Sequence, residues 1–245
     1  MLEDFKLDKW GQVDCFSIPS FNDKNVYHGF STRLNKQEDF VKALGLKNRL
    51  YYLNQVHGNK VLVVEKQFSF EKKKARLPQG DGLITALKNI LLVMFSADCP
   101  ILFFYDPVKE VVGLAHAGWK GTVKGISMEM VKTMKKVFCS SSKDILVGIS
   151  PAIDSCCYEV GEEVIEKLSK ILKNWSMTCY RGVRGKWMLN LKEANALLLV
   201  EEGISRENIT YSTHCTCCNP NLFYSYRRSQ GEKGRMISFI GLGSI

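Results

Sequence analysis

The chain has 245 residues, of which 45% are hydrophobic, and its net charge is +9. This length and apolar content suffice to bury a full core as one domain or two tightly joined halves. No convincing linker divides the sequence, so we expect residues 1–245 to form a single domain. The basic charge favours anionic partners. Because the sequence holds no helix-turn-helix pattern, RNA-binding signature or aromatic–basic stripe, nucleic-acid binding is not expected.

Targeting and membrane segments are not expected either. Met1–Asp14 is charged and lacks the apolar centre of a signal peptide. The longest apolar stretch, Ile90–Tyr105, is interrupted by Asp98 and Pro100 and is shorter than the roughly 20 residues of a membrane-spanning helix. Nine cysteines, an odd number, occur without a secretory signal, which predicts reduced thiols. The sequence therefore predicts a soluble cytoplasmic protein, and we expect a monomer or a weak homodimer.

The first half of the chain predicts mostly strands, because β-branched and aromatic residues crowd short runs that Asn, Asp, Gly and Pro separate. Two of these runs, Leu92–Phe95 and Leu102–Phe104, are apolar on both faces and should be central strands. A short helix is predicted over Lys36–Leu44 and a loop over Lys66–Gln79. The predicted strands are Val26–Ser31, Tyr51–Gln55, Val61–Glu65, Gly82–Thr85, Ile90–Ser96, Ile101–Tyr105 and Val111–His116.

The second half predicts helices mixed with strands. Apolar residues recur at helical spacing in Thr122–Phe138, Gly161–Leu172 and Asn190–Glu202. In the first of these segments the apolar stripe consists of Ile126, Met130, Met134 and Val137. A last strand is predicted over Met236–Leu242. Early strands followed by mixed elements indicate the α+β class, with a mixed β-sheet and flanking helices.

Three residues with chemical potential lie where strand-like runs end in small or turn-forming residues: His57, Cys99 and His116. Each alone is more often a structural residue. Together, two imidazoles and one thiolate suit a zinc ion with one coordination position left open, which is typical of a catalytic site. Asp98 adjoins an apolar run and must be paired or hydrogen-bonded. The small residues after His116 lead into a helix start, where backbone can approach a ligand and anions are attracted.

Motifs spread from Val26 to Leu242 resemble those of the YfiH family, whose members are also labelled polyphenol oxidase or laccase-domain proteins. They are Gln55–Gly58, Asp81–Thr85, Ala97–Pro100, His116–Trp119, Cys157–Gly161 and Phe223–Arg228. The resemblance implies a single α+β domain of the CNF/YfiH type, with zinc held by His57, Cys99 and His116. It also implies phosphorolysis of adenosine, inosine and S-methyl-5′-thioadenosine to free base and ribose 1-phosphate, together with adenosine deamination.

The resemblance also suggests roles for other residues. Gly29–Arg33 matches the family pattern that places an arginine near the active site, so Arg33 is a candidate for gripping phosphate. Lys120 stands where the family commonly has arginine, which weakens bidentate recognition of an anion. The candidates for binding substrate or phosphate are Arg33, Gly118, Trp119, Lys120 and Arg227, and those for catalysis are Asp98, Cys99 and Glu159. Asp98 and Glu159 would carry protons, although Glu159 could instead cap the helix that follows Gly161.

Copper and oxidase chemistry are disfavoured relative to zinc. A multicopper oxidase needs histidines for its blue and trinuclear centres, and four histidines in the whole chain are too few. The H-x-E and P-C-x-x-C signature of zinc nucleobase deaminases is also absent from the sequence. Deamination would therefore use another arrangement, in which zinc lowers the pKa of a bound water toward about 7 for attack on C6 of adenine.

Two rival interpretations remain open. Cys99 could be the nucleophile of a cysteine hydrolase or amidase acting on peptidoglycan precursors, with His116 or His57 as its base. A closed structural zinc site in a binding module would need a fourth protein ligand, and none stands at an obvious spacing. The cysteine-dense segment Cys215–Cys218, which contains Cys217, could hold an extra metal with His214. We interpret these thiols as mostly structural.

Overall fold

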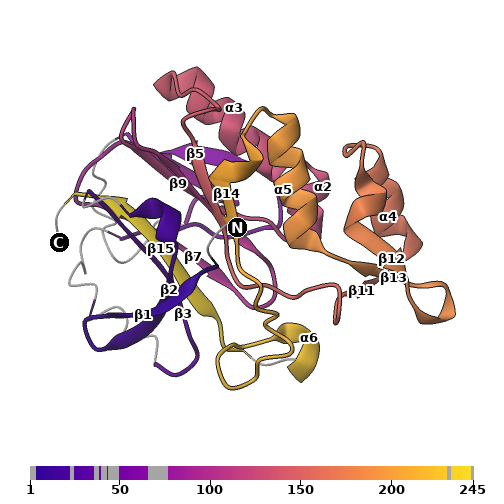
Figure 1. Cartoon of the computed structure of the whole chain (residues 1–245). Helices are drawn as coiled ribbons and strands as arrows, with labels where there is room; N and C mark the ends of the chain where they lie inside the picture. The colour runs from indigo at the N-terminus through magenta and orange to yellow at the C-terminus, as the bar shows by residue number, and fades with distance from the viewer. Residues whose placement is uncertain are drawn as a thin grey trace.

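The computed structural model describes residues 4–22, 25–35, 39, 43, 50–65, 77–230 and 233–243, and its strands form three sheets (Figure 1). The first sheet contains, in order, β1 (Lys6–Trp10), β2 (Val13–Ser17), β3 (Val26–Ser31), β15 (Met236–Leu242), β7 (Leu91–Ser96) and β4 (Leu50–Tyr51). The second contains β14 (Ile209–Tyr211), β10 (Leu146–Ile149), β8 (Ile101–Asp106), β9 (Val111–His116), β6 (Gly82–Thr85) and β5 (Val61–Val63). The third contains β11 (Glu159–Val160), β13 (Trp187–Leu189) and β12 (Cys179–Arg181).

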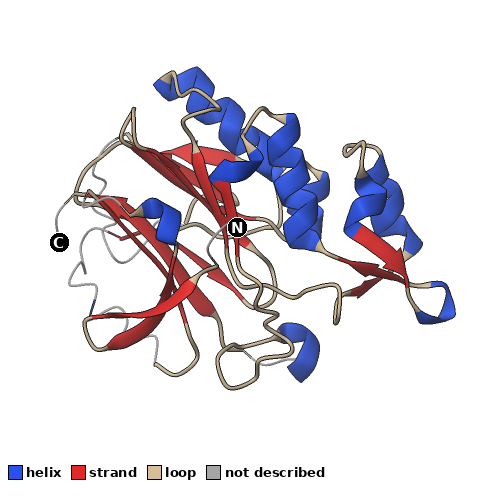
Figure 2. Ribbon diagram, in the orientation of Figure 1, coloured by secondary structure: helices blue, strands red, loops and turns tan. Residues whose placement is uncertain are grey.

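The main helices gather on one side of the molecule (Figure 2). They are α2 (Trp119–Val123), α3 (Ile126–Phe138), α4 (Glu162–Ser169) and α5 (Leu191–Glu201), and a short α6 (Tyr226–Ser229) lies apart from them. Short 3-10 turns occur at Pro19–Phe21, Trp175–Thr178, Val183–Gly185 and Arg206–Asn208. None of the helices in the described ranges is long and apolar enough to cross a membrane.

The second sheet lies between the first sheet and the helices. In β8, Ile101 and Phe103 point into the core shared by the two large sheets, whereas Leu102 and Phe104 pack with α3 and α5. Since side chains alternate along a strand, this strand must be apolar at every position, as the sequence predicted. In β7 likewise, Leu92 joins the core between the sheets. The other face of β7 is covered by residues such as Trp10.

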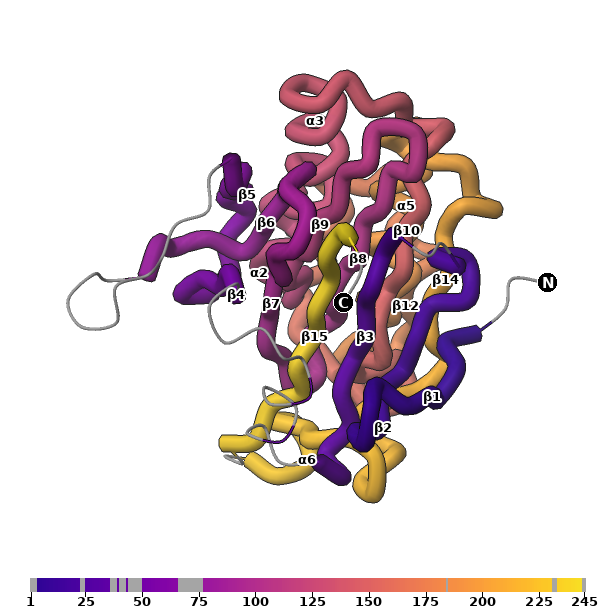
Figure 3. The backbone as a smooth tube through the Cα atoms, turned by 90° about the vertical axis from the view of Figure 1, so that its left-hand side faces the viewer, coloured from indigo at the N-terminus to yellow at the C-terminus, as the bar shows by residue number. Residues whose placement is uncertain are grey.

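Both large sheets are mixed. Their strands pair antiparallel except at the β4–β7, β5–β6 and β10–β14 contacts. The C-terminal strand β15 lies between β3 and β7, so the two ends of the chain share one sheet (Figure 3). The α+β class is confirmed, although the strands divide between two packed sheets and a small third one. Strand patterns reveal which face is buried but not which strands are neighbours.

Most predicted strands are confirmed, several to the residue, but the boundaries differ elsewhere. The strand predicted over Tyr51–Gln55 is wrong, because β4 ends at Tyr51. The helix predicted over Thr122–Phe138 is two helices, since Gly125 adopts a left-handed conformation with φ of 81° and separates α2 from α3. Val137, expected on the buried stripe, is 44% exposed.

Two predicted segments lie largely outside the described residues. The helix predicted over Lys36–Leu44 lies outside the described residues except at Asp39 and Ala43, and the loop predicted over Lys66–Gln79 is described only from residue 77. The sequence pattern did not predict β1, β2, β10, β14 or the strands of the three-stranded sheet. Most of these strands are short or half exposed, so their apolar pattern is weak.

Candidate functional site

His57, Cys99 and His116 meet beside one end of the second sheet, and we call them the trio. His57 lies in the turn between β4 and β5, Cys99 in the turn between β7 and β8, and His116 at the end of β9. Their potential ligand atoms all lie within 4.8 Å of one another, and the two imidazole rings meet edge to face at 4.7 Å. The exposure of the three side chains differs: His116 is buried, Cys99 half-buried and His57 exposed.

The trio borders a cleft of about 650 Å³. Aromatic side chains from three separate segments, Phe95, Trp119 and Tyr158, supply its flat apolar walls. Basic side chains, Lys120, Arg227 and Arg235, lie on the same cleft. A cleft with apolar walls and a few convergent polar groups is the usual form of a small-molecule site. This one suits a flat ring together with an anion.

A buried carboxylate, Asp81, organises two members of the trio. Its oxygens accept hydrogen bonds from the backbone N–H groups of Val56, His57 and Gly58, at 2.7 to 3.1 Å. The same carboxylate lies 2.9 Å from Nδ1 of His116. This contact leaves Nε2 of His116 for a ligand, in the arrangement by which carboxylates orient metal-binding histidines.

Asp98, predicted to be paired, is held by three partners. Its carboxylate accepts hydrogen bonds from the hydroxyls of Thr216 and Ser225, at 2.6 and 3.0 Å, and from the backbone N–H of Arg227 at 2.7 Å. The Asp98 backbone has a positive φ of 85°, which a non-glycine residue rarely adopts. Such a fully engaged side chain is suited to fixing the turn that presents Cys99 rather than to carrying protons.

Members of the trio shift one another's pKa values through hydrogen bonds and charge. Burial opposes ionisation of Cys99, but hydrogen bonds from His116 and His57 outweigh burial and lower the pKa of the thiol to about 6. Burial likewise disfavours the charged form of His116, whereas hydrogen bonds to Asp81 and Cys99 raise its pKa to about 9. Despite burial, the hydrogen bond with His116 lowers the pKa of Asp81. In the metal-free protein these shifts favour a thiolate at Cys99 beside a protonated His116.

Gly118 lets the three ligands approach. A Cβ atom there would lie 2.9 Å from Sγ of Cys99 and 3.3 Å from Cδ2 of His57, so a side chain would push the trio apart. Gly118 is also the N-cap of α2, and its carbonyl accepts the Thr122 N–H. The expectation of a tight turn leading into a helix is confirmed. Trp119 and Lys120 form the first turn of this helix and face the cleft.

The remaining candidates differ in position. Arg227 borders the cleft above the Tyr158 ring, and its guanidinium donates to the carbonyls of Cys157 and Glu159. Arg33 is not among the described residues that line the cleft, and its guanidinium donates to the carbonyl of Pro220. Glu159 is exposed on β11 and is likewise not among those lining residues. The N-cap of α4 is Gly161, and Glu159 lies two residues before it, on β11.

Sequence reasoning missed three residues of the site. Asp81 stands just before the fully buried strand β6, a signal that could have marked it as a paired acid. Gln55 exchanges two 2.9 Å hydrogen bonds with the backbone of Phe95 and ties the His57 turn to the end of β7. Tyr158 comes from a distant segment, and its ring forms part of the cleft wall.

The trio fits a metal ion. Two imidazoles and a thiolate are donors that zinc accepts, Asp81 orients one of them, and the exposed side of the group faces the cleft. These residues suggest a metal but do not identify the element. Three donors beside a cleft leave room for a substrate atom or water, which distinguishes catalytic from structural zinc sites.

Comparison with known proteins finds relatives that are similar over nearly the whole chain. The protein named purine nucleoside phosphorylase YlmD from Bacillus subtilis is 41% identical over 96% of this chain and 93% of its own length. The crystal structure of YlmD from Geobacillus stearothermophilus matches with a TM-score of 0.89 and 30% identity, over 97% of this chain and 99% of its own. That of a Bacillus licheniformis hypothetical protein YfiH matches with a TM-score of 0.86 and 33% identity, over 98% and 99%.

The family model described as "Multi-copper polyphenol oxidoreductase laccase" matches residues 31–243, which include the whole trio. The match spans most of the chain, and the relatives above are similar over nearly their full lengths. The chain therefore belongs to this laccase-like family, the YfiH family.

Proposed function

We propose that this protein is a zinc-dependent enzyme that cleaves purine nucleosides with phosphate. The observation that carries the proposal is the trio, set in a cleft with aromatic walls and basic side chains. The names of the relatives support the reaction type, since the Bacillus subtilis protein is called a purine nucleoside phosphorylase. The substrates would be adenosine, inosine and S-methyl-5′-thioadenosine, and the products free base and a ribose 1-phosphate.

His57, Cys99 and His116 would hold the zinc ion. When bound, the ion would act as a Lewis acid toward a substrate or water oxygen. The two other histidines do not support a copper oxidase. Nε2 of His28 accepts the Ile18 N–H at 2.8 Å, and His214 packs against Phe16 with its Nδ1 3.1 Å from the Ser212 hydroxyl.

The cleft residues suit the two halves of the substrate. Trp119 and Tyr158 would bind the faces of the purine, because flat aromatic rings stack favourably. Burial, with Cys99 nearby, raises the pKa of Tyr158, so its hydroxyl would stay protonated and donate a hydrogen bond. Lys120 and Arg227 would hold phosphate. Arg33 is less suited to this role because the structure places it outside the cleft lining.

The reaction transfers a ribosyl group between two nucleophiles. A phosphate oxygen forms a bond to C1′ while the bond from C1′ to the purine nitrogen breaks, and that electron pair goes to the base. The base takes up the proton that the attacking dihydrogen phosphate loses. Positioning of phosphate by the basic side chains, with the base held between aromatic rings, would supply orientation and charge stabilisation. Adenosine deamination would be a second activity of the same cleft.

An assay of the metal-loaded protein with adenosine, with and without inorganic phosphate, tests the proposal. Adenine and ribose 1-phosphate formed only with phosphate would support phosphorolysis, and inosine formed without phosphate would support the deaminase activity. No turnover of adenosine, inosine or S-methyl-5′-thioadenosine by protein with about one zinc in the trio would contradict the proposal. A cytosolic location and a monomeric or weakly dimeric state remain predictions from the sequence.

A second candidate function rests on the thiolate favoured at Cys99 beside a protonated His116. Cys99 beside His116, with Asp81 behind the imidazole, has the nucleophile, base and orienting acid of a cysteine hydrolase or amidase. Iodoacetamide labelling separates the two functions. Protection of Cys99 by zinc, with activity only in the metal-bound form, favours the phosphorylase. Amide hydrolysis by metal-free protein, lost on alkylation of Cys99, favours the hydrolase.

A further inference from the structure

A second group of thiols lies outside the cleft. The sulfur atoms of Cys156, Cys157, Cys215 and Cys218 all lie within 4.8 Å of one another, and we call this group the thiol cluster. The Cys218 sulfur is 3.5 Å from that of Cys156 and 3.3 Å from that of Cys157. All four residues are free cysteines. They come from two segments, one preceding β11 and the other following β14.

Backbone hydrogen bonds, independent of the sulfur atoms, hold the two segments together. Ala152 pairs with Cys215, and the N–H of Thr216 donates to the Ala152 carbonyl at 3.0 Å. Each segment also forms a turn with its own backbone. The Cys157 N–H donates to the Asp154 carbonyl, and the Asn219 N–H donates to the Cys215 carbonyl. The folded backbone therefore brings the four side chains to one place.

Cys215 and Cys218 have the C-x2-C spacing of metal-binding turns. The backbone N–H of Asp154 donates to the Cys215 sulfur at 3.4 Å, and those of Cys217 and Cys218 donate to it as well. These backbone hydrogen bonds hold the Cys215 sulfur beside the other three.

The spacing and number of the sulfurs match one tetrahedral ion. With zinc–sulfur bonds of about 2.3 Å, the sulfurs of a tetrahedral site lie about 3.8 Å apart. The two sulfur–sulfur distances of Cys218, 3.5 and 3.3 Å, lie just below this value, and all four sulfurs lie within 4.8 Å of one another. A single disulfide would use two of the four sulfurs, whereas one tetrahedral ion would use all four. An iron–sulfur cube would hold its cysteines farther apart, because inorganic atoms lie between them.

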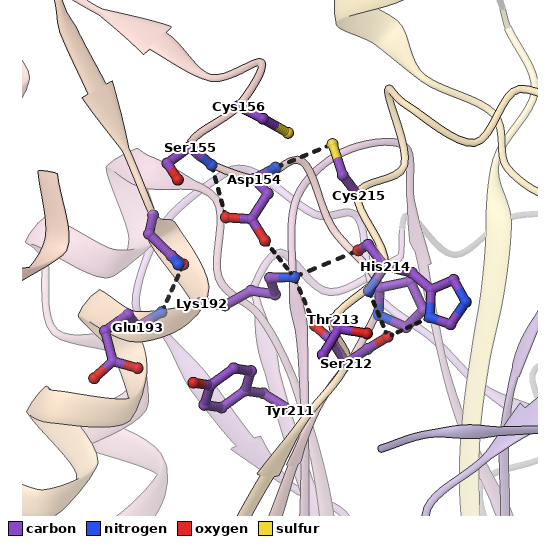
Figure 4. Close-up of polar contacts among 12 residues, drawn as sticks. Asp154, Ser155, Cys156, Lys192, Glu193, Tyr211, Ser212, Thr213, His214 and Cys215 are labelled. Atoms are coloured by element: carbon purple, nitrogen blue, oxygen red, sulfur yellow. Dashed lines mark hydrogen bonds and ion pairs between the residues drawn. The ribbon is translucent and has the colours of Figure 1, made fainter. Parts of the chain in front are cut away.

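Two cationic side chains contact the segments that carry the thiol cluster. Four thiolates with one divalent ion would have a net negative charge. Lys192 is buried, and its ammonium group lies 2.8 Å from the Asp154 carboxylate and donates to the carbonyl of Ser212 (Figure 4). Arg228 donates to the carbonyls of Thr216 and Cys217. In Figure 4 the sulfurs of Cys156 and Cys215 lie on the same side of Asp154. Arg228 therefore places a positive charge beside the segment that carries Cys215 and Cys218, whereas Asp154 balances the charge of Lys192.

We propose that Cys156, Cys157, Cys215 and Cys218 bind one zinc ion in a closed structural site. Four protein ligands leave no position for a substrate, so the ion would stabilise rather than react. Its two segments carry part of the cleft wall, since Tyr158 directly follows Cys157 and Thr216 holds the Asp98 carboxylate. The ion would therefore fix this wall. The inference does not depend on the proposed function, because it involves none of the trio.

The test uses the full chain with His57→Ala and Cys99→Ala, so that the trio no longer binds metal. After loading with zinc under reducing conditions and dialysis, we expect about one zinc per chain. Adding Cys218→Ser should abolish this zinc. Adding Cys139→Ser, a change of an exposed cysteine outside both sites, should leave the zinc unchanged.

Cobalt provides a readout that does not depend on how well the Cys218→Ser variant folds. In the parent with the disabled trio, bound Co²⁺ should give intense sulfur-to-cobalt charge-transfer bands and the visible spectrum of a tetrahedral four-sulfur site. Absence of these bands, a zinc content near zero, or zinc retained after Cys218→Ser would overturn the proposal. A mass lower by two hydrogens with no bound metal would overturn it in favour of a disulfide.

Discussion

The trio and the thiol cluster differ in donor number and in what lies beside them. The trio has three mixed donors on a cleft of about 650 Å³, and a buried carboxylate orients one of them. The thiol cluster has four sulfurs contributed by two hydrogen-bonded turns. An ion in the first would keep a position for a substrate, whereas an ion in the second would be enclosed. Donor number, more than donor type, separates a candidate catalytic site from a structural one.

The two sites are joined through Asp98. Its backbone precedes Cys99 of the trio, and its carboxylate holds Thr216, which lies between Cys215 and Cys218 of the thiol cluster. The same carboxylate accepts the N–H of Arg227. A disturbance of either site can therefore reach the other by way of one buried side chain, and variants should separate direct effects from transmitted ones.

Among residues that support the two sites, the largest expected effect is that of Asp81→Asn, which acts on the trio alone. The amide has one acceptor oxygen where the carboxylate has two, so it cannot satisfy both His116 and the three backbone N–H groups. Loss of such an orienting partner should lower kcat/KM for phosphorolysis by about 10- to 100-fold. Steady-state kinetics with adenosine and phosphate measure it. An unchanged kcat/KM would show that Asp81 does not position the trio.

Lys192→Met should act on the side of the thiol cluster. The change leaves the Asp154 carboxylate and the Ser212 carbonyl without their buried cation. Because the Asp154 side chain is 21% exposed, the expected loss is about 2 kcal/mol in the free energy of unfolding, below that of a fully buried pair. Urea denaturation at neutral pH checks it. A midpoint equal to that of the unaltered chain would contradict this account of Lys192.

Gly118→Ala should move the ligands of the trio without removing any. The new methyl group would meet Sγ of Cys99 at 2.9 Å, so the thiol must shift by a few tenths of an ångström. We expect about a tenfold loss in kcat, less than the hundredfold that a full ångström can cost. Denaturation with urea is the control, because the backbone φ of Gly118, −60°, is allowed for alanine. Full kcat in a folded variant would argue against a tightly spaced trio.

The smallest expected effect is that of Thr216→Val, which removes one link between the two sites. Valine has nearly the shape of threonine but cannot donate to Asp98, which keeps its bonds to Ser225 and Arg227. The free energy of unfolding should fall by about 1 to 2 kcal/mol. Thermal and urea unfolding measure this, with Thr213→Val, at an exposed threonine, as a comparison. Equal stability losses in both variants would contradict the special role of Thr216.

The sequence predicted Cys99 and His116 from strong apolar runs that do form strands, whereas the strand expected before His57 ends at Tyr51. It did not predict Asp81 as the organiser, since its partners lie on the His57 turn and at the end of β9. The thiol cluster was missed for a similar reason: Cys156 and Cys218 are 62 positions apart, and only the paired backbone joins them. Arg33 was assigned to the cleft by motif alone, which gives no direction for a side chain.

The fold was predictable to the same degree. Strands such as β8 and β9 carry their own pattern, whereas the division into two packed sheets depends on pairings between distant segments, such as β15 with β3 and β7. Local backbone conformation also limited the prediction of helix boundaries. Gly125 ends the preceding helix just before the apolar stripe begins, and periodicity alone does not detect a left-handed residue.

The central claim is that the trio is the catalytic centre, and the most direct test measures phosphate-dependent release of adenine by Cys99→Ala. The control is Cys139→Ser, which also removes one thiol but lies outside both sites. The account predicts that Cys99→Ala loses more than about 100-fold in kcat/KM, because it removes a ligand rather than a supporting contact. Cys139→Ser should match the unaltered chain. Adenine release by folded Cys99→Ala at the rate of the control would contradict the account.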